Sequence, residues 1–461
     1  MLKAVTLLFV SVLALSAPAA WATPPAIPDA ASLSTMVSAQ AASTSPAAEA
    51  YQYAAEPYLA ARNAPNDFTE ADRWAYQQTV SRASQQCQLL SNKTLTATGM
   101  VEKSVLAADG PAELLALGKL CILGQDWEPA REALIDYLAT PGIKDKRSAY
   151  FQMIEVFLNL HDMIAAESDL DSLVGQYPYN AQIHLAIDWV IDATEKHPEL
   201  DVVGQLDAMQ APYILKALAD GGTLSSKTGK VGPLTLFEDG LRCADDWRRR
   251  GEEKRAAAYV VKLEAALSQL SARSALSSMQ VEQIRNAFSR YALTGQSLAS
   301  LGLESLKGEV FTPSGKVVSR TITMIGRPHA MVAISLGAPT SVSILEQLVA
   351  HLPRNSAGHS EVSVLAITSY EANSGVDQPS ASVVTALKAL RHDLPSQVTL
   401  LLVPQVRLSR LFVDAYPSEV AVNAEGNVLY VSISPASTAN VERVIASFKN
   451  QRGSILPVTR A

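Results

Sequence analysis

The most reactive side chains in this sequence belong to three cysteines, Cys87, Cys121 and Cys243. No two of them have the Cys-x-x-Cys spacing of a redox-active dithiol. Because their number is odd, at least one thiol stays unpaired. For Cys87 and Cys121, a disulfide and two separate thiols both remain open. The seven histidines are scattered along the chain, and we expect neither a metal site nor a bound cofactor.

The segment Ala338-Pro339-Thr340-Ser341 stands where an expected helix begins. A Gly326-Arg327-Pro328 turn and the apolar run 330–334 precede it. This spacing resembles the envelope thiol-disulfide oxidoreductases of the TlpA-like family, in which a Gly-Lys-Pro turn leads through a buried strand to Cys-Pro-Pro-Cys. The resemblance places Ala338 at the nucleophile position and Ser341 at the resolving position.

These two residues cannot perform the exchange chemistry of that family. Thiol-disulfide exchange requires a thiolate that attacks a disulfide sulfur, and Ala338 has no nucleophilic atom. Ser341 keeps a hydroxyl, but neither a histidine nor a carboxylate lies nearby in sequence to activate it. We therefore expect no catalytic residue in this degenerate motif, and we expect Thr340 and Ser341 to cap the helix.

The sequence after the motif continues the resemblance to a thioredoxin-like fold. Patterns of apolar residues predict strands over 361–368, 398–403 and 428–433, and helices over 379–394 and 437–448. The family carries a cis-proline that faces its cysteine loop, and the resemblance makes Pro417 the candidate for it. The alternative is an ordinary trans proline that opens a strand.

The amino-terminal region has the composition of an export signal. Residues 1–22 combine an early lysine, an apolar core and an Ala-x-Ala cleavage site, so we interpret them as a signal peptide. Residues 23–50 are rich in Ala, Ser and Pro and are expected to form a flexible leader. We expect an exported, periplasmic protein without stable membrane insertion, because the apolar core is too short for a lasting span.

Residues 51–303 show helical periodicity and resemble tetratricopeptide repeats. Three units place a small residue thirteen positions after their first apolar residue, at Ala130, Ala166 and Ala256. Stacked repeats present a concave surface suited to a peptide or protein segment. The alternative is a helical spacer whose groove binds nothing.

Charge restricts the class of partner. The net charge of -7 argues against nucleic acid or an anionic membrane as the main partner. The mixed-sign run 245–255 is interpreted as a solvated helix face and turn. A protein or peptide partner is therefore the expectation.

Together these patterns predict a multidomain chain, with an all-α tetratricopeptide-like domain at 51–303, an α/β thioredoxin-like domain at 304–450 and a tail at 451–461. The leading hypothesis is a protein-interaction or scaffold protein with a non-redox thioredoxin-like domain. The alternative is a TlpA-like protein with a residual or partner-dependent redox role in the cell envelope. A third hypothesis makes the terminal domain a purely structural cap on the helices.

Overall fold

The computed structural model describes residues 45–61, 70–92, 110–194, 202–226, 230–334, 339–354, 360–370, 381–404, 409–411, 417–433 and 439–453. The chain divides into two compact units, Met1–Ala133 and Leu134–Ala461. The expected signal peptide, most of the expected leader and most of the expected tail lie outside the described residues. No helix in the described ranges is long and apolar enough to cross a membrane.

The first unit contains three packed helices, α2 (Pro46–Ala61), α3 (Glu70–Asn92) and α5 (Pro111–Leu123). The expected leader is therefore too long at its end, because a helix already begins at Pro46. That helix buries Ala47 and Ala48 completely, and the Ala47 amide donates to the buried Glu113 carboxylate at 2.9 Å. The sulfurs of Cys87 on α3 and Cys121 on α5 lie 2.08 Å apart, in a disulfide.

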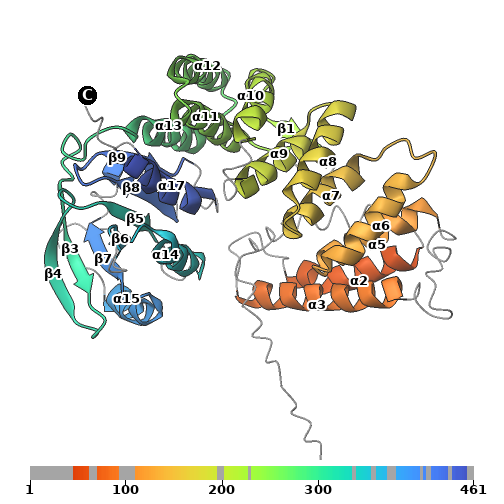
Figure 1. The fold of residues 1–461 in the computed structure, drawn as a ribbon, viewed down its shortest axis with the longest axis horizontal. Helices are drawn as coiled ribbons and strands as arrows, with labels where there is room; N and C mark the ends of the chain where they lie inside the picture. Colours follow the sequence, from red (N-terminus) through yellow and green to blue (C-terminus); the bar gives the residue numbers. More distant parts are fainter. Residues whose placement is uncertain are drawn as a thin grey trace, which may run out of the picture. The chain divides into compact units, whose positions relative to one another are not determined.

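Helices make up the first part of the second unit (Figure 1). After α6 (Trp127–Ala139), which spans the division between the units, they are α7 (Arg147–Asn159), α8 (Met163–Gln176), α9 (Ala181–Thr194), α10 (Val203–Ala219), α11 (Pro233–Arg249), α12 (Glu253–Ala272) and α13 (Ser278–Leu293). Neighbours in sequence pack together from α7 to α12, and α13 packs on α11. The small residues Ala166 and Ala256 are buried between helices, as close helix pairs require. Two short strands, β1 (Leu224–Ser225) and β2 (Lys230–Val231), form a hairpin between α10 and α11. The finer assignment to tetratricopeptide repeats stays a prediction.

A seven-stranded mixed sheet follows, with the order β4-β3-β7-β6-β5-β8-β9. Its strands are β3 (Ser305–Phe311), β4 (Val317–Thr323), β5 (His329–Ala333), β6 (Ser363–Tyr370), β7 (Val398–Pro404), β8 (Ser418–Val422) and β9 (Val428–Val431). Strands β5, β6 and β7 run parallel, and the remaining pairings are antiparallel. The helices of this part are α14 (Pro339–His351), α15 (Ala381–Asp393) and α17 (Ala439–Gly453), with a 3-10 turn at Ser409–Leu411. The strands and helices expected after the motif are thus present, with bounds shifted by a few residues.

Strand β5 is buried on both faces, which explains its uninterrupted apolar sequence. Ala330 and Val332 join a core with α14, α15 and α17, whereas Met331 and Ala333 join a second core on the opposite face. The second core also contains residues from 293–303, the segment that follows α13. The sheet is therefore covered by helices on one face and by this connecting segment on the other.

The connecting segment also bonds to the turn between β8 and β9 and to the first residue of β9. Backbone hydrogen bonds run from Leu298 N to Gly426 O at 2.8 Å and from Gly295 N to Val428 O at 2.7 Å. The expected domain boundary at 303 follows directly on these contacts and lies inside the second compact unit. Independent folding of residues 304–450 stays a prediction.

Candidate functional site

The degenerate motif follows the inner strand β5 in the sequence. Ala338 falls outside the described residues, as do the side chains of Pro339, Thr340 and Ser341, while the backbone of the latter three forms the first turn of α14. Their predicted capping role is therefore not described.

Strand β8 brings Pro417 to the end of β5. In the antiparallel β5–β8 register, Ser418 pairs with Ala333, the last residue of β5. Pro417 directly precedes that pair and is buried. The peptide bond from Tyr416 to Pro417 involves a residue outside the described ranges, so the cis geometry stays a prediction. The register places Pro417 next to the pair formed by Ser418 and Ala333, at the end of β5.

The same strand carries a buried carboxyl that the sequence interpretation gave no role. Glu419 is fully buried and pairs with Val332 on β5. Burial raises the pKa of Glu419 to about 7, against the lowering effect of Ser432 and Asn440. A carboxyl with a pKa near neutrality can give or take a proton, but the described residues place no thiol beside it. A single Glu within the apolar strand 418–422 was the available sequence signal.

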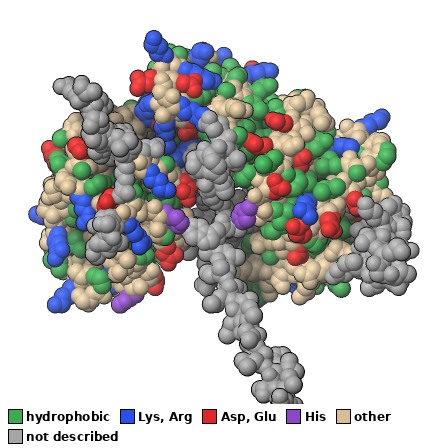
Figure 2. All heavy atoms as spheres, in the orientation of Figure 1, with side chains coloured by type: hydrophobic (Ala, Val, Ile, Leu, Met, Phe, Trp, Pro, Cys, Tyr) green, Lys and Arg blue, Asp and Glu red, His purple; other side chains and the backbone are tan. Residues whose placement is uncertain are grey.

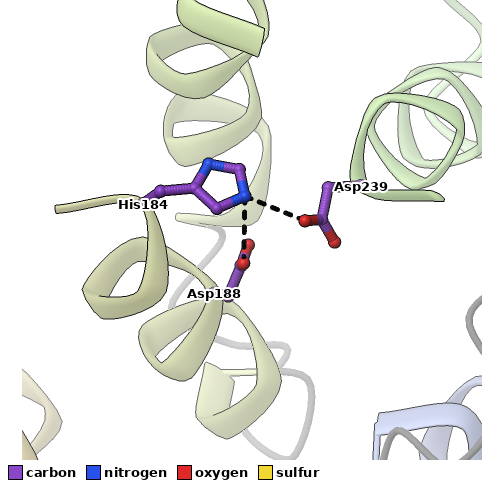
Figure 3. Close-up of side chains that lie close together, drawn as sticks. All are labelled: His184, Asp188 and Asp239. Atoms are coloured by element: carbon purple, nitrogen blue, oxygen red, sulfur yellow. Dashed lines mark hydrogen bonds and ion pairs between the residues drawn. The ribbon is translucent and has the colours of Figure 1, made fainter. Parts of the chain in front are cut away.

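A second polar cluster lies among the helices, where His184 and Asp188 of α9 face Asp239 of α11 (Figure 3). His184 Nε2 lies 2.9 Å from Asp239 Oδ2 and 3.4 Å from Asp188 Oδ2. Burial lowers the pKa of His184, but the two carboxylates raise it, and the net direction is upward. The sequence interpretation missed this cluster, because the histidines are scattered and Asp239 lies 55 residues after His184.

Arg242 and Gln210 also belong to this cluster, and the Tyr179 hydroxyl lies 2.8 Å from His184 Nδ1. Arg242 Nη2 donates to Asp188 Oδ1 at 2.8 Å and to Gln210 Oε1 at 2.9 Å. The Gln210 amide nitrogen therefore faces Asp188 Oδ1 at 2.7 Å and His184 Nδ1 at 3.1 Å. With an N–H donor at Nδ1, the neutral ring carries its proton on Nε2 and donates it to Asp239.

These contacts favour a structural role for the cluster over a metal centre. A metal ion on Nε2 would displace the hydrogen that joins His184 to Asp239. It would also lie close to the Arg242 guanidinium, which already supplies a positive charge to the two carboxylates. Burial alone would raise the pKa of Asp188, but Arg242 and His184 hold it below its ordinary value. We interpret the group as an ion network that joins α9, α10 and α11.

The network continues to Asp207 on α10 and the thiol of Cys243 on α11. Asp207 is 0% exposed, and burial followed by the charge of Asp246 raises its pKa to about 8, against the effect of Arg242. Burial and Asp207 raise the pKa of the Cys243 thiol well above its ordinary value. Cys243 is therefore a buried, protonated thiol with little reactivity.

The network then crosses to the elements of the sheet. Arg443 of α17 pairs with Asp246 at 3.3 Å, and the Arg249 guanidinium lies 4.8 Å from the centre of the Tyr430 ring on β9. Asp245 and Asp246 are buried. The expectation that the run 245–255 is a solvated face is therefore wrong for its first residues, because α11 is enclosed by α10, α12, α13 and this contact with α17.

Comparison with known proteins adds little beyond this topology. The sequence matches no protein family profile, and no curated protein is significantly similar to it. Among solved structures, a thioredoxin-like protein from Aeropyrum pernix is 16% identical over 31% of this chain and 89% of its own, with a TM-score of 0.22. A thioredoxin-like protein from Bacteroides caccae is 13% identical over 69% of this chain and 92% of its own, with a TM-score of 0.25. With TM-scores this low, the thioredoxin-like fold rests on the strand order and register given above.

Proposed function

We propose that this chain is an exported protein-interaction protein whose thioredoxin-like domain has no redox role. One observation carries the proposal: where a redox-active member of the resembled family has its two cysteines, this chain has Ala338 and Ser341. The three cysteines of the chain all lie in the helices that precede the sheet. Two of them form a disulfide, and Cys243 is buried.

Two further features support the proposal. A disulfide between Cys87 and Cys121 suits an oxidising compartment such as the periplasm, in agreement with the interpretation of residues 1–22 as an export signal. Binding surfaces of the tetratricopeptide type accept peptide or protein segments, and the helical region resembles such repeats. The partner class is accordingly a protein or peptide.

The second candidate function is a partner-dependent redox role of the TlpA-like kind. Glu419 favours it, since this carboxyl with a pKa near 7 lies one residue pair from the end of β5. A group of this kind could assist proton transfer if a partner supplied both thiols.

Insulin reduction by dithiothreitol tests the absence of intrinsic redox activity. Wild type should match the rate without protein. The double variant Ala338→Cys, Ser341→Cys should exceed it, because Pro339, the start of α14 and Pro417 would already frame the restored pair. The matched control is Ala338→Ser, which adds a polar atom but no thiol and should stay at the rate without protein.

Capture of clients from envelope extract by the mature chain distinguishes the proposals. A specific client without thiol dependence supports protein interaction. A client that is retained only as a mixed disulfide or released by reductant supports the redox alternative. Turnover of insulin by wild type that survives replacement of all three cysteines by serine would contradict the proposal of a non-redox domain.

A further inference from the structure

Strand β4 is the outer strand of the sheet beside β3, and no other strand among the described residues pairs with it (Figure 1). Its register with β3 is continuous from Ser305↔Thr323 to Phe311↔Val317, without a bulge. One row of backbone N–H and C=O groups on β4 thus faces away from the sheet. Such an edge is a template for a further strand.

The hydrogen bonds at the two ends of the hairpin show which residues supply this row. Met324 N donates to Glu304 O at 2.8 Å, and Thr312 N donates to Lys316 O at 2.9 Å. In an antiparallel ladder, bonded and non-bonded pairs alternate. Even-numbered residues of β4 therefore bond to β3, while the backbone groups of Ser319 and Thr321 point outward.

This edge lacks most of the features that usually prevent strand addition. It contains no proline and no bulge, and its residues are mainly Val, Thr and Ile, which favour strands. Five of its seven residues are exposed. The single charge on the strand is Arg320 at its centre.

Charge indicates which strand would fit. The hairpin from Glu304 to Met324 carries Lys307, Lys316 and Arg320 against Glu304 and Glu309, so it has one more positive than negative charge, although the whole chain has a net charge of -7. Basic side chains lie along the edge of the molecule where Figure 1 draws β4 (Figure 2). A second copy paired antiparallel over the full strand would place Arg320 opposite Arg320, which is unfavourable. An acidic residue opposite Arg320 would instead be attracted.

We propose that the outer edge of β4 binds an extended, acidic segment of a partner protein by strand addition, with a carboxylate opposite Arg320. Because Arg320 bonds to β3, its neighbour on an antiparallel added strand would occupy a non-hydrogen-bonded pair, in which side chains lie closest. Backbone bonds to Ser319 and Thr321 would supply affinity, and the carboxylate would supply selectivity. This inference rests on the proposed interaction function and names a surface and partner chemistry for it.

The test uses the full mature chain and a fluorescent peptide, Thr-Val-Thr-Glu-Thr-Val-Thr. Because this sequence is symmetric, its Val, Glu and Val residues can lie opposite Val318, Arg320 and Ile322 in either strand direction. Replacing its Glu by Lys should weaken binding roughly tenfold. The variant Arg320→Glu should reverse that preference.

The variant Thr321→Pro removes an outward N–H without removing a bond to β3, and it should weaken binding by tenfold or more. Thr321→Val keeps the N–H and should bind like wild type. Circular dichroism checks that the proline variant is folded. If it is not, binding of the Glu and Lys peptides to Arg320→Glu tests the inference instead.

Equal binding of the Glu and Lys peptides, or unchanged binding by folded Thr321→Pro, would overturn the inference. So would self-association that Thr321→Pro abolishes, since the occupant would then be a second copy. A client from envelope extract that binds wild type and Thr321→Pro equally would remove the β4 surface but leave the proposed function intact. Absence of any client would instead count against the proposed function.

Discussion

The buried carboxyl of Asp207 makes a sharp test of the ion network. Its pKa of about 8 in the folded protein compares with an ordinary value of 3.8. Between these two pH values the folded chain holds a proton that the unfolded chain has lost. The folded state then binds more protons, so stability falls as pH rises. Asp207→Asn removes this proton uptake and should gain stability over wild type across the same range.

The size of the effect follows from linkage. Each pH unit between the two pKa values changes the free energy of unfolding by about 1.4 kcal/mol, and the change levels off as pH reaches the folded pKa. From pH 6 to pH 8, the advantage of Asp207→Asn over wild type should therefore grow by about 2 kcal/mol. Urea unfolding at pH 6, 7 and 8, followed by far-ultraviolet circular dichroism, measures it.

The exposed residue Asp220, just beyond the end of the same helix, provides the matched control. Asp220→Asn makes the same chemical change in water, so its difference from wild type should stay constant over this pH range. An Asp207→Asn advantage that is also constant, or that shrinks with pH, would show that Asp207 is ionised in the folded protein. Asp207 would then not be a protonated member of the ion network.

The remaining predictions concern the disulfide and the contact between helices and sheet. Replacing Cys87 and Cys121 together by alanine opens a covalent loop with a sequence separation of 34 and should lower stability by about 3 to 4 kcal/mol, measured by urea unfolding with and without reductant. Arg443→Met leaves the buried Asp246 without this cation and should lower the free energy of unfolding by about 3 kcal/mol in the same assay. Adding Asp246→Asn should recover part of this stability, and no recovery would argue against the ion pair. A fragment of residues 304–461 should unfold at lower urea than the sheet does in the full chain, and an unchanged midpoint would show that the helices contribute nothing to the sheet.

Much of the thioredoxin-like part was predictable because inner strands such as β5 and β8 are buried on both faces. Burial of both Ala330 and Met331 forces an uninterrupted apolar run, which sequence inspection detects directly. The Pro-Ser-Glu-Val segment was equally visible, and the register of β8 with β5 puts Pro417 at the expected end of the sheet. Glu419 carried a signal too, since an isolated carboxyl in such a strand must be protonated or paired.

The helical ion network was not predictable in this way. Asp188, Asp239 and Arg242 stand on helices at spacings that also occur on solvated faces, where opposite charges three or four residues apart are common. Only the packing of α9, α10 and α11 decides that these side chains face one another. A single sequence does not reveal which helix lies beside which. For the same reason, the sequence suggests a solvated face for the mixed-sign run 245–255, although its first residues are buried.

The contact between the helices and the sheet also depends on packing that a single sequence does not reveal. It changes the interpretation of the expected domain boundary at 303. Sequence shows two kinds of periodicity, and a change of periodicity at 303 suggests a linker. In the structure the residues just before that point bond to the turn between β8 and β9 and to the first residue of β9, Ile433 packs in the helical core, and Arg290 donates to the Ile433 carbonyl at 3.0 Å. Arg443 adds a buried ion pair. Because an unpaired buried charge is costly, separation of the two parts would have to expose or neutralise these groups. A change of secondary structure in the sequence therefore marks a change of architecture here, but it does not mark a place where few interactions cross.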